Sequence, residues 1–89
     1  MSILLLYSVY DQGAQAYLRP FWSDFKVNAQ RSFRQLINQK DNSDNMVANH
    51  PDQFTLFELG EFDVRTGVFS SHALPLTLGN GLEYKDVAA

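Results

Sequence analysis

The side chains with the clearest potential for chemistry are cations and aromatic rings that lie close together in the first half of the chain. The set comprises Arg19, Phe21, Trp22, Lys26, Arg31 and Arg34, with Tyr17 beside it. Aromatic rings stack on unpaired bases and cations follow the phosphate backbone, so this combination is typical of proteins that bind single-stranded nucleic acid. Rings that close a core and charges that solubilise a helix would give the same pattern. Both interpretations stay open on the residues alone.

Residue types that catalyse reactions or bind metals are scattered. His50 precedes a proline and His72 lies far along the chain, so the two histidines form no recognised metal motif. Glu58 and Glu61 are three positions apart in an expected strand, which places them on opposite faces unless a bulge at Gly60 intervenes. The chain has no cysteine and no glycine-rich phosphate loop. We therefore predict a protein that is not an enzyme and needs no metal or cofactor.

Charge is distributed unevenly along the 89 residues, which have a net charge of −3. Residues 17–40 carry five cations against one carboxylate, whereas residues 41–89 carry two cations against eight carboxylates. An acidic chain argues against tight nonspecific binding to duplex DNA, because that affinity comes from many phosphate contacts. A local basic face on residues 17–40 remains compatible with this argument.

The segments that would position these side chains begin with an N-terminal strand. Residues 3–10 carry apolar side chains on both faces, which favours a strand that is covered on each side. Turn residues and the Arg-Pro pair predict a loop over residues 11–22. A helix is expected to begin near Ser23 or Asp24, either of which can cap it. Its buried stripe, at spacings of three and four, comprises Phe25, Ala29, Phe33, Leu36 and Ile37.

The middle of the chain is polar and favours turns. Residues 39–49 are rich in Asn and Asp, which predicts a mobile loop that Met46 and Val47 could tether. Residues 50–53, His-Pro-Asp-Gln, are expected to form a turn into the next strand.

Two further strands are predicted as a hairpin over residues 54–62 and 68–74. Gly60 is expected to mark a bulge or a close backbone approach. Gly67 would supply the positive φ of the hairpin loop. Pro75 would end the last strand or place it at a sheet edge.

These elements predict an α+β domain of β-α-β-β order over residues 1–75. One helix would pack on a three-stranded, mostly antiparallel sheet, and a homodimer would cover the second apolar face. Residues 76–89 are interpreted as a C-terminal extension or tail. No segment reaches the ~20 apolar residues that a bilayer span needs, so no membrane association is expected.

Several segments occur in an order that resembles a known family. Arg-Pro-Phe-Trp at residues 19–22 follows the N-terminal strand and a Tyr-Asp turn, and Ala-Gln-Arg-Ser-Phe at residues 29–33 lies on the expected helix. The most specific match runs from His50 to Asp63, with its Gly-Glu-Phe-Asp segment, and continues to a Thr-Gly pair. Over most of residues 4–69 the sequence resembles the small nonstructural protein family of gokushoviruses, single-stranded DNA phages of the Microviridae. The chain from Leu74 onward departs from the family pattern.

The resemblance implies a nonstructural phage protein that is made in the cytoplasm of the infected bacterial host and is absent from the virion. It also implies a role in viral DNA replication, at the shift from duplex to single-strand synthesis, with no catalytic residues. We therefore expect a nonenzymatic accessory protein whose partner is single-stranded DNA or replication proteins, through the basic helix face and the aromatic loop. The alternative is a protein–protein interaction adaptor, without nucleic-acid affinity, that binds a host or phage protein by edge-strand pairing or by the loop over residues 11–22.

Overall fold

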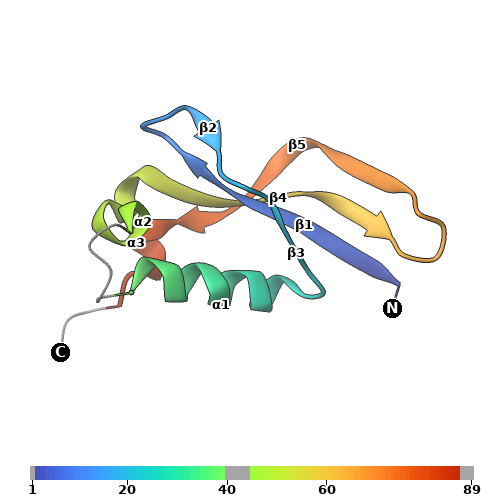
Figure 1. Ribbon diagram of the computed structural model, residues 1–89, viewed down its shortest axis with the longest axis horizontal. Coiled ribbons are helices and arrows are strands. Elements are labelled where there is room, and N and C mark those ends of the chain that lie inside the picture. Colours follow the sequence, from blue (N-terminus) through green and yellow to red (C-terminus); the bar gives the residue numbers. More distant parts are fainter. Residues whose placement is uncertain (1, 40–44, 87–89) are drawn as a thin grey trace.

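Three long antiparallel strands form the central sheet of the molecule (Figure 1). The computed structural model describes residues 2–39 and 45–86. Strands β1 (Ile3–Asp11) and β5 (Phe69–Asn80) flank β4 (Phe54–Asp63). This confirms the predicted α+β class with a mainly antiparallel sheet.

Helix α1 (Lys26–Ile37) lies along one face of this sheet, as Figure 1 shows. No helix of the described chain covers the opposite face. We call the face toward α1 the inner face and the opposite one the outer face. The sequence predicted that such an outer face would need a second molecule to cover it.

Two short strands extend the sheet along the free edge of β1. Both β2 (Ala16–Tyr17) and β3 (Phe21–Ser23) pair antiparallel with β1, so the sheet has five strands rather than the predicted three. The prediction of a continuous loop over residues 11–22 is therefore wrong. Pairing satisfies backbone groups of β1 that a bare strand edge would leave open, which is a tertiary effect that turn residues in the sequence do not reveal.

Helix α1 begins later than predicted. Phe25 is its N-cap, with an extended backbone and no side-chain hydrogen bond to the helix. Neither predicted cap serves, because Ser23 is held in β3 opposite Leu5 and its hydroxyl donates to the Phe25 carbonyl oxygen at 3.0 Å. Asp24 is exposed and lies before the cap.

The core lies between α1 and the inner face. Within the predicted stripe, Ala29, Phe33 and Ile37 are buried as expected and Leu36 is half-buried. Phe25 is 61% exposed, because it precedes the first helical turn. The sheet and the short helices supply the other buried apolar side chains, which are Tyr7, Val9, Val47, Phe54, Leu56 and Tyr84.

A short helix, α2 (Met46–Asn49), occupies the end of the segment predicted as a mobile loop. Asn45 caps it by accepting a hydrogen bond from the first turn, in agreement with the preference of Asn for this position. Val47 is buried and anchors the segment, whereas Met46 is exposed. The rest of that predicted loop, residues 40–44, lies outside the described residues.

One turn of 3-10 helix, η1 (Pro51–Gln53), leads into β4 where the sequence predicts a turn. At the other end of β4 a hairpin leads to β5, and Gly67 has the expected positive φ, 75°. Residues 72–75 of β5 bulge out of the register, because the paired positions on either side of them are Ser71 and Leu76. Figure 1 shows the resulting bend in β5.

The C-terminal part of the described chain packs as part of the domain, unlike the extension expected from residue 76 onward. Strand β5 runs through Pro75, which is tolerated because β5 is an edge strand that pairs with β4 alone. Helix α3 (Gly81–Tyr84) follows, with a capping box formed by Asn80 and Glu83. Tyr84 is buried in the core. No helix within residues 2–39 and 45–86 is long and apolar enough to cross a membrane.

Candidate nucleic-acid interface

The outer face is built from uncharged side chains. Cross-strand partners share a face, so the outward positions follow from the register with alternate residues of β1. In the described part of the chain these positions are Leu4, Leu6, Ser8, Tyr10, Tyr17, Trp22, Thr55, Phe57, Gly60, Phe62, Phe69, Ser71, Thr77 and Asn80. None of them is charged, and six are aromatic.

A bulge in β4 decides which of its side chains reach this face. Consecutive residues Leu6 and Tyr7 of β1 pair with Gly60 and Glu58, so Leu59 is one extra residue in β4. The sequence-based prediction of a bulge or close approach at Gly60 is confirmed on both counts. A Cβ at that position would lie 2.6 Å from a backbone oxygen of β5.

The extra residue reverses the alternation beyond it. Glu58 and Glu61 therefore both lie on the inner face, opposite alternate residues of β1. The sequence predicted opposite faces for a regular strand and a change of side if a bulge occurred at Gly60, and the second case is the one that the register shows. By the same shift Phe57 and Phe62 both lie on the outer face.

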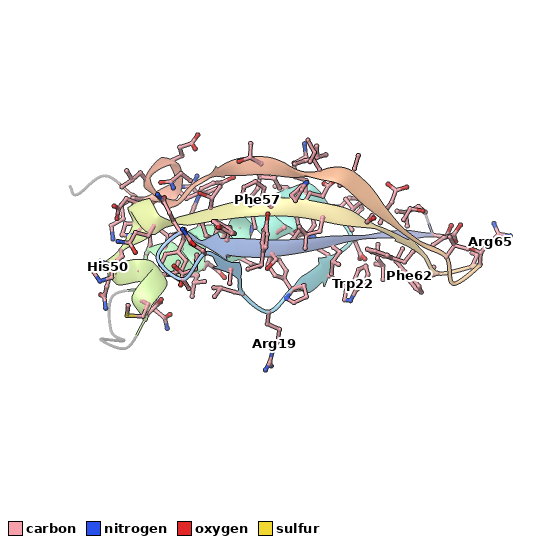
Figure 2. The ribbon with its side chains drawn as sticks, turned by 90° about the horizontal axis from the view of Figure 1, so that it is seen from above. Arg19, Trp22, His50, Phe57, Phe62 and Arg65 are labelled. Atoms are coloured by element: carbon pink, nitrogen blue, oxygen red, sulfur yellow. The ribbon has the colours of Figure 1, made fainter. Side chains whose placement is uncertain are left out.

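Three rings form the tryptophan cluster, which consists of Trp22, Phe62 and Phe69. The ring centroid of Trp22 lies 5.7 Å from that of Phe62 and 6.2 Å from that of Phe69. Trp22 is 48% exposed and Phe69 47%. Figure 2 shows Trp22 and Phe62 close to each other on the face that is turned away from α1.

Three other rings form the tyrosine cluster, which consists of Tyr10, Tyr17 and Phe57. The ring of Tyr17 packs edge-on against both others, at 4.9 Å from Tyr10 and 5.7 Å from Phe57. Tyr17 is 41% exposed. Each cluster thus presents at least one partly exposed ring on a surface that the described chain does not cover.

Positive charge borders this face at two places. Arg19 lies in the connection between β2 and β3 and Arg65 in the hairpin between β4 and β5, and both are exposed. In Figure 2 Arg19 projects away from the sheet edge and Arg65 lies at the hairpin end. Since Glu58 and Glu61 of β4 point to the inner face, the outer face is free of carboxylates at its described paired positions although the chain is acidic.

The structure divides the predicted binding residues between opposite sides of the molecule. Arg19 and Trp22 belong to the outer face and its border. Phe21 points inward, where its ring stacks on buried Tyr7 with centroids 5.9 Å apart, so it packs against the core. Lys26 lies in the first turn of α1, beneath the other side of the sheet.

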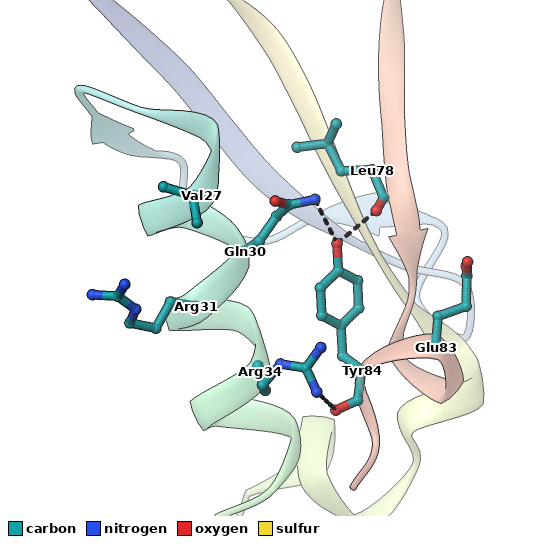
Figure 3. Close-up of a pocket in the computed structure, with 7 residues that line it drawn as sticks. All are labelled: Val27, Gln30, Arg31, Arg34, Leu78, Glu83 and Tyr84. Atoms are coloured by element: carbon teal, nitrogen blue, oxygen red, sulfur yellow. Dashed lines mark hydrogen bonds between the residues drawn. The ribbon is translucent and has the colours of Figure 1, made fainter.

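Arg31 and Arg34 also lie on α1, and Arg34 is already engaged. Its guanidinium donates to the Tyr84 carbonyl oxygen and pairs with Asp86, both at 3.3 Å, and lies 5.4 Å from the centroid of the Tyr84 ring. Figure 3 shows Arg34 directed toward Tyr84 and Arg31 extending away from it. The basic helix face and the outer rings therefore cannot form one continuous surface.

A cavity of about 530 Å³ lies between α1 and α3 and includes both of these arginines in its lining (Figure 3). Its polar groups mostly bond to each other. The Tyr84 hydroxyl donates to the Leu78 carbonyl oxygen at 2.7 Å and accepts from the Gln30 amide at 3.1 Å. These bonds fasten α3 and the end of β5 to α1.

Titratable groups meet at one place on the inner face. His72 Nε2 lies 2.7 Å from Glu58 Oε2, and Glu58 is the cross-strand partner of Tyr7. Burial, assisted by the neighbouring Glu58 carboxylate, raises the pKa of Tyr7 to about 12. The described residues contain no group of three or more His, Cys, Asp or Glu that could hold a metal ion. We interpret the His72–Glu58 contact as a tie between β4 and the bulged part of β5.

The sequence analysis did not include four of the outer-face rings among the predicted binding residues: Tyr10, Phe57, Phe62 and Phe69. The alternation of residues 3–10 did assign Tyr10 to the second face of β1. The other three could be assigned only with the register of β4 and β5, including its bulge.

Comparisons with known proteins identify the family. No curated protein and no solved structure matches the chain. The model of one protein family matches residues 4–84, which includes every strand and helix described above except the first residue of β1. The match continues past Leu74, where the sequence analysis expected a departure from the family pattern. This chain is a phage protein and belongs to the phage ORF5 protein family.

Proposed function

We propose that this phage protein is a nonenzymatic accessory factor of viral DNA replication that binds single-stranded DNA on its outer sheet face. The observation that carries the proposal is the gathering of six aromatic rings on an uncharged face without a covering helix in the described chain. The resemblance to gokushoviruses supports a single-stranded DNA phage as the source. It also supports action in the infected cell, outside the virion, at the shift to single-strand synthesis.

Base stacking is the interaction that this face favours. Each base that stacks on an aromatic side chain contributes ~1–3 kcal/mol to binding, and an antiparallel sheet with exposed rings is a common platform for unpaired bases. Trp22, Phe69 and Tyr17 are each about half exposed, so they can contact a base without unfolding. Their packing against neighbouring rings holds them in place before binding, which reduces the entropy cost.

Electrostatics favours the same face. Arg19 and Arg65 can each contact a phosphate at its border, whereas the carboxylates of β4 lie on the inner face. A strand that followed the helix side would meet Arg31, but also the acidic side chains of Glu83 and Asp86. We therefore assign DNA binding to the outer face instead of the basic helix face.

A second copy of this chain is the competing occupant, since the sequence predicts a homodimer that covers this face. A protein adaptor would use the same apolar surface. Both alternatives bury the rings against protein, so they predict that the rings are protected without DNA.

The test uses the fluorescence of Trp22, the only tryptophan in the chain. Titration with oligothymidylate at low salt should quench it, and Arg19→Glu should weaken binding several-fold. Arg31→Glu is the matched control, because it makes the same charge change on an exposed arginine of the helix side and should leave affinity unchanged.

Two results would overturn the proposal. The first is an unchanged Trp22 spectrum with oligothymidylate in a protein that sediments as a stable dimer, which would assign the face to self-association. The second is a loss of binding with Arg31→Glu but not with Arg19→Glu, which would return the site to the helix.

A further inference from the structure

We propose that one DNA strand bridges the tryptophan cluster and the tyrosine cluster, so that the outer face has two linked base-stacking subsites. This inference rests on the proposed function and goes beyond it, because it specifies how many bases are held and how far apart. It follows from the placement of the rings in two separate groups instead of one continuous patch.

The separation of the subsites follows from the register. Phe62 pairs with Leu4 and Phe57 pairs with Ser8, so the two clusters are four residues apart along β1. At ~3.3 Å per residue this corresponds to ~13 Å. Stacked nucleotides rise ~3.4 Å each, so the gap corresponds to about four nucleotide steps in a stacked strand and fewer in an extended one.

The surface between the clusters is low and uncharged. Gly60 has no side chain and pairs with Ser71, while Ser8 is buried and its hydroxyl donates to the Leu18 carbonyl oxygen at 2.7 Å. No ring and no carboxylate occupies the outward paired positions of β4 between Phe57 and Phe62. Leu6, the β1 residue at the level of Gly60, is half-buried, so a sugar–phosphate chain can pass from one cluster to the other over Gly60 and Ser71.

Because both clusters bind the same strand, the gain in affinity from bridging can be estimated. When one base has stacked on the first cluster, a second base on the same strand binds intramolecularly, which can raise affinity by ~10²–10⁴ if the strand reaches. A dinucleotide has a single step and cannot span ~13 Å, whereas an eight-nucleotide strand can. The affinity of a bridging strand thus depends on both clusters, and that of a dinucleotide on only one.

The experiment is a backbone-amide NMR titration of the isotope-labelled full chain with dithymidylate and with octathymidylate. Phe69→Thr removes a ring of the tryptophan cluster. Leu76→Thr is its matched control, because Leu76 lies on the same strand with nearly the same exposure, 50%, but pairs with inner-face Glu58. Tyr17→Thr provides the equivalent change in the tyrosine cluster, with neighbouring Leu18→Thr as its control.

In the wild type and both controls, octathymidylate should bind at least tenfold more tightly than in either cluster variant, and it should shift amides at both clusters. Dithymidylate affinity at the intact cluster should change less than twofold in either cluster variant. A long strand can also bind in more registers than a short one, which raises its affinity without bridging. This statistical gain is the same for the wild type and the variants. A difference in octathymidylate affinity between wild type and cluster variants therefore measures bridging alone.

The outcomes separate this inference from the proposed function. If oligothymidylate binds the outer face but the ratio of the two affinities is the same in wild type and in Phe69→Thr, the linked subsites are wrong and DNA binding stands. If neither oligonucleotide shifts outer-face amides, DNA binding itself is wrong. If rising protein concentration alone shifts those amides, a second copy covers the face and both proposals are overturned.

Discussion

Phe57 and Phe62 lie on the same face of the sheet although their residue numbers in β4 differ by an odd number. In a regular strand they would point to opposite sides, and one ring would enter the region beneath α1. The extra residue at Leu59 restores their common direction and also turns Glu58 and Glu61 to the inner face. A single bulge thus sets both the aromatic character and the neutrality of the outer face.

Gly60→Ala should destabilise the domain by about 1–3 kcal/mol, because a Cβ would lie 2.6 Å from the Ser70 carbonyl oxygen and 2.9 Å from the Ser71 Cα. Denaturant unfolding measures the change. Gly67→Ala serves as the comparison, since its Cβ meets open space and only its positive φ is penalised, by ~1 kcal/mol. An equal or smaller loss at Gly60 would show that the bulge can relax.

Stability should decline at high pH through Tyr7. Its pKa in the folded protein is raised to about 12 from an ordinary value of 10.0, so the folded state holds the proton more tightly than the unfolded one. The stabilisation is complete below about pH 10 and is lost as pH rises from there through the folded pKa. Denaturant midpoints across this window, in wild type and in Tyr7→Phe, measure the effect.

The alkaline decline should be much weaker in Tyr7→Phe, which cannot ionise. Tyr17→Phe is the matched control, because it removes the same hydroxyl from a partly exposed side chain outside the core. A wild-type profile that matches that of Tyr7→Phe would contradict the proposed origin.

Tyr84→Phe should cost about 1–2 kcal/mol in the free energy of unfolding, since it leaves the Leu78 carbonyl oxygen and the Gln30 amide without their hydroxyl partner. Leu82→Ala, in the same short helix but exposed, should cost less than about 0.5 kcal/mol. Thermal or denaturant unfolding distinguishes the two. Similar small losses for both would mean that α3 contributes little to the fold.

The salt dependence of DNA binding should be shallow. Two border arginines, Arg19 and Arg65, imply a slope of log affinity against log salt of about −1.4, from ~0.7 per phosphate contact on a single strand. Arg19→Glu should reduce the slope toward about −0.7, whereas Arg31→Glu should not change it. A slope several times steeper would point to a much larger basic surface than the outer face provides.

The features that depend on residues close together in the chain could be predicted from the sequence. Alternation in residues 3–10, the helix stripe of Ala29, Phe33 and Ile37, and the positive φ at Gly67 were all predicted. Each depends on side chains close in sequence and on a periodicity of two or 3.6.

The missed features depend on distant pairing. Residues 16–17 and 21–23 are strands because β1 offers them an open edge, and this same pairing delays the start of α1. Tyr84 enters the core only because the hairpin returns β5 past Pro75 to the helix. Distant pairing also divides the predicted binding residues, since neighbouring Phe21 and Trp22 point to opposite faces and Arg34 contacts the C-terminal segment.

The irregular stretch at residues 72–75 has a consequence for the behaviour of the protein at high concentration. Strand β5 ends the sheet, and an uninterrupted ladder there would act as a template on which further chains add in register. Pro75 lacks an amide hydrogen, and the unpaired residues around it break the ladder into two short pieces. This irregular edge therefore disfavours the addition of further chains to β5 and the growth of fibres.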